Sequence, residues 1–345
     1  MMRKTARFTG ILLLLAIGIY ATLVLMPRRY AVQPVVPRPG FRYMELSTGS
    51  RIAWKKISSR SGAAQTPIIY VHGGPGGFIS ERLEVSLLPL AEMGHDLYLY
   101  DQVGSGLSER LDHIREYTVS RHQQDLEAFI KASGASKVIL YGHSWGAILA
   151  TVFTAAHPEL VEKLILSGPG HLPPVRKELA GIVAPDSMHL RQPQYTNATA
   201  NREANNIRTH AVADVAMRFG IKLAPDAEMD AFQTFLNGKL MKSTVKDTTT
   251  LSGDVPGGSG YYAQLMTMYS FANTPDPRPA LKKVKLPVLI LRGQYDNQKW
   301  GYVTEYLELM PQSRLVIIPD AGHSISFDQP EMTRAAIRNF LQSQQ

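Results

Sequence analysis

The sequence contains no cysteine. Disulfide bonds, thiolate metal sites, a cysteine nucleophile and a lipidated cysteine are therefore excluded. Metal-ligating spacings are also missing, because the ten histidines are scattered and no His-Glu-x-x-His pattern occurs. We accordingly expect no bound metal ion.

Acidic residues are absent from the first 30 positions, which hold five basic residues: Arg3, Lys4, Arg7, Arg28 and Arg29. These five account for most of the formal net charge of +8 and leave +3 for the remaining chain. The other Lys and Arg residues are dispersed and form no basic stripe interleaved with aromatic side chains. We therefore expect no nucleic-acid partner.

A long apolar run lies between those basic groups. It covers Gly10–Met26, and Phe8 and Thr9 extend it to 19 residues. A helix of that length just crosses about 30 Å of hydrocarbon. The run ends without the small-x-small motif of a cleaved signal peptide, and its flanking charges disfavour a buried core helix. We predict an uncleaved transmembrane signal anchor with a cytoplasmic basic end in residues 1–30, contacting the lipid bilayer through residues 8–26. The remaining chain would then lie on the extracytoplasmic side.

The rest of the chain alternates between strand and helix patterns. Residues 31–40 are proline-rich and predict a semi-rigid spacer. A hairpin follows, and then short apolar runs that each precede a helical pattern: Ile68–Val71, Leu97–Tyr100, Val138–Tyr141, Leu164–Leu166, Val288–Leu291 and Leu315–Ile318. Such runs are typical of strands buried on both faces. They predict an α/β fold with a mostly parallel central sheet flanked by helices, built from residues 41–169 and 281–345. The alternation breaks over residues 170–280, which we expect to form a mostly helical cap.

The clearest chemical signal is the pentapeptide Gly142-His143-Ser144-Trp145-Gly146. An apolar strand runs directly into it, and an apolar helical segment follows it. In this setting flanking glycines allow a sharp strand-to-helix turn that exposes a serine hydroxyl at the end of the sheet. We interpret Ser144 as a nucleophile.

A serine nucleophile needs a base, and the base needs a carboxylate to orient it. Asp296 follows the expected strand at Val288–Leu291, and His323 follows the one at Leu315–Ile318. Open parallel sheets place their sites at these carboxyl ends. We therefore predict a triad of Ser144, Asp296 and His323.

A glycine-rich loop, His72-Gly73-Gly74-Pro75-Gly76-Gly77, follows another expected strand. Fixed backbone N–H groups stabilise the negative charge that develops during acyl transfer. We expect the N–H groups of Gly74 and Trp145 to form the oxyanion hole. His72 is expected to brace the loop, and Asp101 to hydrogen-bond either this loop or the nucleophile turn.

These motifs together resemble the prolyl iminopeptidase branch of the α/β hydrolases, a serine peptidase family. The resemblance rests on HGGPGG, DQVGSGLS, GHSWG, RGQYD and AGHS, and extends from about residue 41 to 343. It implies a helical cap over the site and neither a metal nor an organic cofactor.

Members of that branch bind the free α-amino group of the substrate with cap glutamates. The resemblance makes Glu228 and Glu203 the candidate substrate-binding residues, with Asp230 nearby. No glutamate occurs between Glu228 and Glu305, and the stretch 257–262 stands where the later cap glutamate is expected.

Large side chains follow that stretch, namely Tyr261, Tyr262, Met266 and Met268. They predict either a larger, more apolar acyl pocket or an ordinary cap core. With one glutamate missing, we expect weak proline aminopeptidase activity and faster hydrolysis of short or medium esters.

The sequence thus predicts a serine hydrolase that cleaves a small amide or ester, from a small molecule or short peptide, through an acyl-enzyme. A carboxylesterase or lipase-like hydrolase of apolar esters is one alternative. A non-catalytic binding protein with a hydrolase fold is the other.

Overall fold

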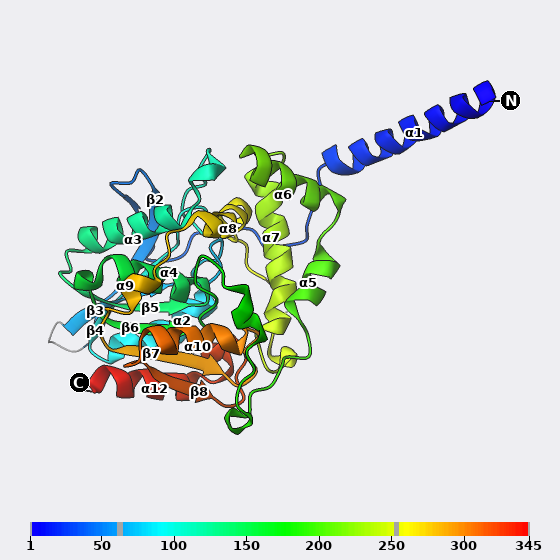
Figure 1. Cartoon of the computed structure of the whole chain (residues 1–345). Coiled ribbons are helices and arrows are strands. Elements are labelled where there is room, and N and C mark those ends of the chain that lie inside the picture. Colours follow the sequence, from blue (N-terminus) through cyan, green and yellow to red (C-terminus); the bar gives the residue numbers. More distant parts are fainter. Residues whose placement is uncertain (1, 61–64, 252–254, 344–345) are drawn as a thin grey trace.

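The computed structural model describes residues 2–60, 65–251 and 255–343, with the side chains of the first helix described at Thr9 and residues 11–25. Within these residues one sheet of eight strands has the order β1-β2-β4-β3-β5-β6-β7-β8 (Figure 1). The strands are β1 (Arg42–Glu45), β2 (Arg51–Ile57), β3 (Gln65–Val71), β4 (His95–Tyr100), β5 (Val138–His143), β6 (Val161–Ser167), β7 (Val288–Gly293) and β8 (Arg314–Ile318). Pairs β1–β2 and β2–β4 are antiparallel, and the other pairs are parallel. The expected α/β fold with a mostly parallel sheet is confirmed.

Helices cover both faces of the sheet. They are α2 (Glu81–Glu92), α3 (Val119–Ser133), α4 (Trp145–Ala156), α10 (Trp300–Leu309), α11 (Ile325–Asp328) and α12 (Pro330–Gln342). Apolar side chains of α3, α4 and α10 form one core with the sheet, and those of α2 and α12 form a second core on the opposite face. The strands between the two cores are buried on both sides, and β7 is buried along its whole length.

Local signals in the sequence explain where these helices begin and end. Ser80 and Thr118 cap α2 and α3 by accepting hydrogen bonds from the N–H groups of the first turn. Gly134 ends α3 in the left-handed conformation, at φ 77°. The core helices are thereby held at fixed lengths beneath the loops that leave the strands.

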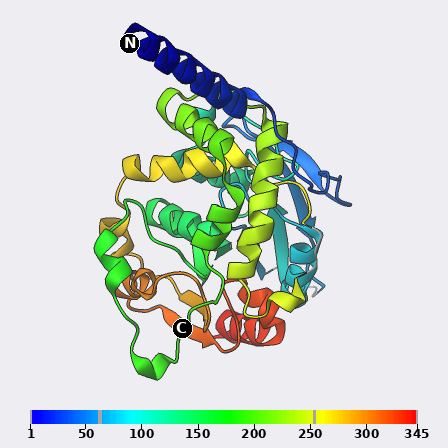
Figure 2. The same cartoon turned by 90° about the vertical axis from the view of Figure 1, so that its right-hand side faces the viewer.

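The segment between β6 and β7 forms a mostly helical cap over the carboxyl end of the sheet (Figures 1 and 2). It contains α5 (Asn197–Ala204), α6 (Ile207–Phe219), α7 (Asp226–Leu240), α8 (Tyr261–Tyr269) and α9 (Arg278–Leu281). Single 3₁₀ turns supplement these helices along the chain: Ile114–Glu116, Pro158–Leu160, Lys177–Gly181, Asp186–Met188, Met241–Ser243, Thr248–Thr250 and Ser270–Asn273. The helices α6, α7 and α8 share an apolar core of their own, which also receives Val103, Ile114 and Tyr117 from the sheet side. The cap is therefore packed onto the domain through side chains.

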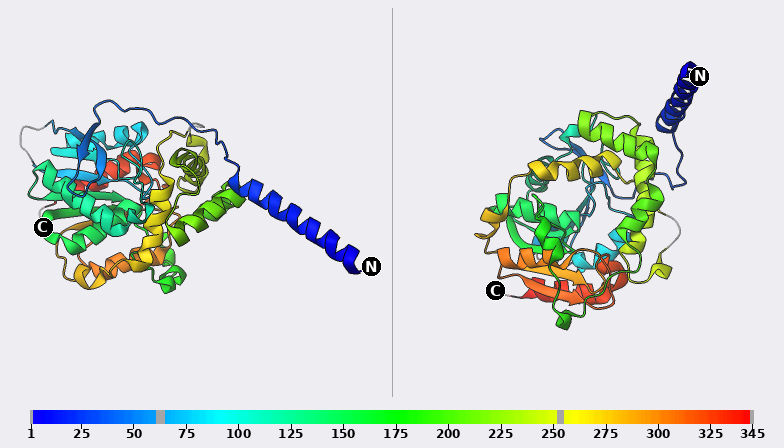
Figure 3. Two further views of the ribbon diagram at one scale, coloured as in Figure 1. Left: turned by 90° about the horizontal axis from the view of Figure 1, so that it is seen from above. Right: turned by 45° about the vertical axis from the view of Figure 1, so that its right-hand side comes forward.

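Residues 26–39, which we call the strap, lie along the cap and the sheet rather than spanning open solvent (Figure 3). The ring of Tyr30 contacts Phe232 and Phe235 of α7, with centroid distances of 5.4 and 5.7 Å. At the other end, Arg38 forms an ion pair with the fully buried Asp101. Tyr30 and Arg38 therefore attach the strap to the body at two points, whereas most of its residues are exposed.

The first helix, α1 (Met2–Leu25), extends away from the rest of the molecule (Figures 1 and 3). Its described apolar side chains are largely exposed, for example Leu14 at 70% and Ile19 at 62%. In the described part of the chain, no helix combines the length and the apolarity needed to cross a membrane.

Candidate active site

Ser144 sits at the turn between β5 and α4, the position expected for a nucleophile. Its backbone is left-handed, with φ 54° and ψ −116°, a conformation that costs a non-glycine residue about 1–3 kcal/mol. A Cβ atom on Gly146 would lie 1.9 Å from the carbonyl oxygen of Val71, and one on Gly142 would lie 2.3 Å from the carbonyl oxygen of Gly146. The two glycines therefore allow the backbones to pass closely enough to form the turn, which leaves Ser144 partly exposed.

Asp296 and His323 lie beyond the carboxyl ends of β7 and β8 and contact each other. His323 Nδ1 is 2.9 Å from Asp296 Oδ1, which also accepts a hydrogen bond of 2.9 Å from the N–H of Gln298. Asp296 is fully buried. Burial alone would raise its pKa, but His323, the charge of Arg292 and the Gln298 N–H together lower the pKa of Asp296 to about 2. The carboxylate is therefore ionised and able to hold the imidazole.

The end of β6 connects the nucleophile turn to this pair. Ser144 N donates to the carbonyl oxygen of Ser167 at 2.8 Å. The next residue, Gly168, has φ +56°, and a Cβ atom there would lie 2.8 Å from His323 Nδ1 and 3.2 Å from Asp296 Oδ2. In the described chain His323 is hydrogen-bonded to Asp296 and not to Ser144. Contacts between nucleophile and base are commonly loose without substrate and tighten when it binds.

His143, inside the nucleophile motif, packs against His323, the candidate base. The rings of His143 and His323 are 5.0 Å apart between centroids. Burial, reinforced by the neighbouring His323, lowers the pKa of His143 to about 3, so His143 stays neutral. Among the described residues no group of three or more His, Asp or Glu side chains has the arrangement of a metal site.

Gly74 and Trp145 place two backbone donors at the same end of the sheet. Gly74 turns back at φ +51°, with Gly77 N donating to its carbonyl oxygen at 2.6 Å. Trp145 is the first residue of α4, and the first N–H groups of a helix have no partner within it. Over the described residues, neither of these two N–H groups donates to a protein acceptor. Both donors are available to an oxyanion.

Gln102 braces this loop. Its backbone N–H donates to His72 Nε2 at 2.9 Å, and its side-chain oxygen accepts from the indole N–H of Trp145 at 2.8 Å. His72 is fully buried, which lowers its pKa. The imidazole is therefore a structural acceptor rather than a base. The carboxylate of Asp101 hydrogen-bonds neither the nucleophile turn nor the glycine loop, contrary to expectation; it accepts from Ile79 N and Leu107 N and pairs with Arg38.

The glycines of the cap fasten it to the oxyanion loop, at what we call the glycine seam (Gly76, Gly104 and Gly257–Gly260). Gly260 N donates to the carbonyl oxygen of Gly76 at 2.8 Å, and Gly106 N donates to that of Gly258 at 2.6 Å. A Cβ atom on Gly260 would lie 1.8 Å from the carbonyl oxygen of Gly104. The stretch 257–260 therefore allows the backbones to pass close to each other.

Gln264 is a residue of this site that the sequence analysis missed. Its side-chain oxygen is 3.1 Å from the position a Cβ atom would take on Gly74. Gln264 lies one helical turn after Gly260, to whose carbonyl oxygen its N–H donates at 3.1 Å. Its place is set by the glycine seam, and no sequence motif marks that contact.

Glu228 and Glu203, the predicted substrate-binding residues, each have partners within the protein. Arg208 donates to both oxygens of Glu228, at 2.5 and 2.7 Å, and Arg28 N adds a bond of 3.0 Å. Burial would raise the pKa of Glu228, but these donors lower it. Glu203 is on the surface, where it accepts from Tyr195 and pairs with Lys239. The protein itself therefore supplies the cations and donors that both carboxylates contact.

Asp230 and the aromatic pair after the seam are also structural. Asp230 pairs with Arg110 and accepts from Tyr261 N, both at 2.9 Å. Tyr262 donates its hydroxyl to the carbonyl oxygen of Ala224 at 2.7 Å. Tyr261, Tyr262 and Met266 belong to the apolar core of the cap, and Met268 is 37% exposed. Of the two interpretations of these side chains, the ordinary cap core holds.

Comparisons with known proteins agree with this fold. The family described as alpha/beta hydrolase fold matches residues 66–330. A proline iminopeptidase of Heyndrickxia coagulans is 26% identical over 306 residues, covering 86% of this chain and 96% of the relative. An esterase of Thermogutta terrifontis has a TM-score of 0.61 at 19% identity, over 87% of this chain and 97% of the esterase. A proline iminopeptidase of Mycobacterium smegmatis has a TM-score of 0.56 at 19% identity, with the same two coverages.

Gly168→Ala tests whether the end of β6 positions His323. The added methyl group would displace the imidazole, and a misplacement of about 1 Å costs roughly 100-fold in rate. We expect kcat on an ester substrate to fall about 100-fold. Gly134→Ala is the matched control, because Gly134 has φ +77° but nothing within 4 Å of its added Cβ. Both variants should lose about 1–2 kcal/mol in urea unfolding, whereas an equal loss of kcat in both would refute the positioning role.

Proposed function

Because this chain belongs to the α/β-hydrolase family, we propose that it is a serine hydrolase working through an acyl-enzyme. The observation that carries the proposal is the bond between His323 and the ionised Asp296, beside the strained turn that carries Ser144. A serine in an ordinary turn has no need of such a conformation. The pairing of this turn with a buried His–Asp couple is what acyl transfer requires.

In this mechanism Ser144 Oγ attacks the carbonyl carbon of the substrate, and His323 Nε2 accepts the proton. Asp296 fixes the imidazole so that Nδ1 carries the other proton, and it stabilises the imidazolium that forms. The carbonyl oxygen becomes negatively charged and is bound by Gly74 N and Trp145 N. His323 then protonates the leaving group, and a water molecule, activated in the same way, releases the acid.

We further propose that the substrate is a small ester or amide without a free ammonium group next to the scissile bond. Burying an ammonium costs several kcal/mol unless a carboxylate meets it. The cap acids Glu228 and Asp230 are already paired with arginines, and Glu203 is on the surface. Gln264 instead presents a neutral amide beside Gly74, with no hydrogen-bond partner in the described chain for its side chain. An amide serves a neutral polar group on the substrate.

The helix α1 supports a separate proposal, that the chain is attached to a lipid bilayer with its catalytic domain on the extracytoplasmic side. Apolar side chains around the helix are more than half exposed: Ile11, Leu12, Leu13, Leu14, Leu15, Ile17, Ile19 and Leu25. Each costs free energy in water that a hydrocarbon environment removes. The acid-free residues before this run favour the cytosolic side for the N-terminus.

The nucleophile is tested with a fluorophosphonate probe, which reacts with activated serines. Wild-type protein should be labelled once, on Ser144, and Ser144→Ala should abolish both labelling and ester hydrolysis. His323→Ala should cost nearly as much, because triad members act as a unit. Labelling of folded protein at another serine, or not at all, would favour a non-catalytic hydrolase-fold protein instead.

The substrate class is tested by comparing kcat/KM for p-nitrophenyl butyrate, prolyl-naphthylamide and N-acetyl-prolyl-naphthylamide. We expect the ester to be fastest and the free amine to give no advantage over its acetylated form. Gln264→Glu supplies the missing carboxylate and should raise the preference for the free amine, whereas Glu203→Gln should change nothing. A preference of 100-fold or more for the free amine in the wild type, about 2.7 kcal/mol, would contradict this proposal and favour an aminopeptidase.

Membrane attachment is tested by alkaline carbonate extraction of cells that express the full chain. The protein should remain in the membrane pellet with its N-terminus intact. A variant with Leu12, Leu14 and Ile17 changed to Gln should move to the supernatant with unchanged esterase activity. Extraction of the unaltered chain into the supernatant, or a mature N-terminus beyond about residue 22, would contradict the proposal of an uncleaved membrane anchor.

A further inference from the structure

A second site lies outside the triad, around Arg292 on β7. Arg292 is 2% exposed, and one of its guanidinium nitrogens, Nη2, donates to the carbonyl oxygen of Gln298 at 2.8 Å. The other two nitrogens, Nε and Nη1, are buried and have no hydrogen-bond partner among the residues that the structure describes. Leaving donors of a buried cation unpaired is costly, and native structures rarely do so. These donors therefore call for an acceptor.

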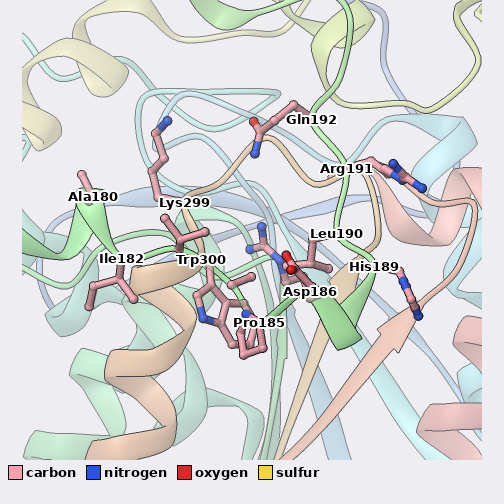
Figure 4. A pocket seen from close by; sticks show the side chains of 14 residues that line it. Ala180, Ile182, Pro185, Asp186, His189, Leu190, Arg191, Gln192, Lys299 and Trp300 are labelled. Atoms are coloured by element: carbon pink, nitrogen blue, oxygen red, sulfur yellow. The ribbon is translucent and has the colours of Figure 1, made fainter.

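Arg292 lines a cavity of about 420 Å³, formed between the loop 180–192 and the start of α10 (Figure 4). Small-molecule pockets commonly occupy about 300–1,000 Å³. Trp300 provides an apolar wall, and Ile182 on the loop is 40% exposed. The space is therefore large enough for an organic molecule and presents it with an aromatic surface.

The charges around this cavity are mainly positive. Lys299 and Arg191 line it from different segments, and neither makes a salt bridge in the described chain (Figure 4). Lys299 precedes the first turn of α10, where no side chain caps the free N–H groups. The N-terminus of a helix favours an anion. Asp186 is the acidic residue of the lining, and no salt bridge links it to Arg292.

We propose that this cavity binds a small organic anion, with its carboxylate or phosphate on Arg292 and its apolar body against Trp300. A carboxylate or phosphate oxygen supplies the acceptor that the buried guanidinium lacks. The apolar body covers the exposed side chains of the loop. The site is separate from Ser144, but it adjoins the triad, since Gln298 accepts from Arg292 and donates to Asp296.

Isothermal titration calorimetry on the full chain tests the site with benzoate, phenyl phosphate, inorganic phosphate and the neutral benzamide. We expect the two aromatic anions to bind at millimolar concentration or tighter. Benzamide should bind at least tenfold more weakly, because it lacks the charge. Whichever aromatic anion binds tighter identifies the head group, and inorganic phosphate should be weaker than phenyl phosphate because it lacks the apolar body.

Variants at the exposed edge of the cavity decide the location without threatening the fold. Lys299→Gln should weaken benzoate binding about threefold to tenfold, and Asp186→Asn should strengthen it by a similar factor. Arg292→Gln should abolish it. Binding should persist in protein whose Ser144 carries the phosphonate, because the catalytic site is then blocked. Equal binding of benzamide, unchanged affinity in both edge variants, or loss of binding on phosphonylation would overturn the proposal. The edge variants decide it even if Ser144 proves unreactive.

Discussion

Backbone passing directly against backbone at the carboxyl edge of the sheet is the constraint on which the site depends. Gly146 passes over the carbonyl of Val71, and Gly260 passes over that of Gly104, where added Cβ atoms would lie 1.9 and 1.8 Å from the carbonyl oxygens. No side chain fits at such distances. The nucleophile turn, the oxyanion loop and the cap can therefore approach closely only because glycines stand at these contacts. This close approach fixes the positions of their polar groups.

The electrostatic pattern follows from how the buried charges are paired. Asp101 is matched by Arg38 and Glu228 by Arg208, each inside the protein. A buried carboxylate that already has its cation cannot also neutralise a substrate ammonium. Arg292 differs, because among the described residues only one of its three guanidinium nitrogens, Nη2, has a hydrogen-bond acceptor. Among the described residues, Arg292 therefore keeps two buried donors without an acceptor.

The sequence could predict those parts of the structure that depend on local spacing. The buried strands follow from short apolar runs, and Asp296 and His323 lie together because each leaves the end of a parallel strand. The roles of Glu228 and Gln264 could not be read in this way. Arg208 lies 20 residues from Glu228 on another helix, and Gln264 reaches Gly74 through a seam between distant loops. Both depend on how the cap docks, and no periodic pattern encodes the docking.

The contacts of the strap could not be predicted from the sequence either, because a proline-rich segment has no periodic pattern that indicates which face packs against the body. Its ion pair with Asp101 joins residues 63 apart in sequence. Proline fixes the backbone without supplying a donor, so the strap is held by Tyr30 and Arg38 and by backbone contacts such as Arg28 N to Glu228.

The glycine seam has a consequence for how relatives of this protein can diverge. A cap can gain or lose residues where its loops face solvent, as between β6 and α5 or at Thr248–Thr250 after α7, since longer surface loops carry only a small entropic cost. Between Gly257 and Gln264 the chain lies against two core loops, to which it is hydrogen-bonded through Gly76 and Gly106. One inserted residue would shift the hydrogen bonds to both loops. Substrate preference can therefore change when the outer loops become longer or shorter. Residues 257–264, in contrast, must keep their number in any relative that retains the same oxyanion loop.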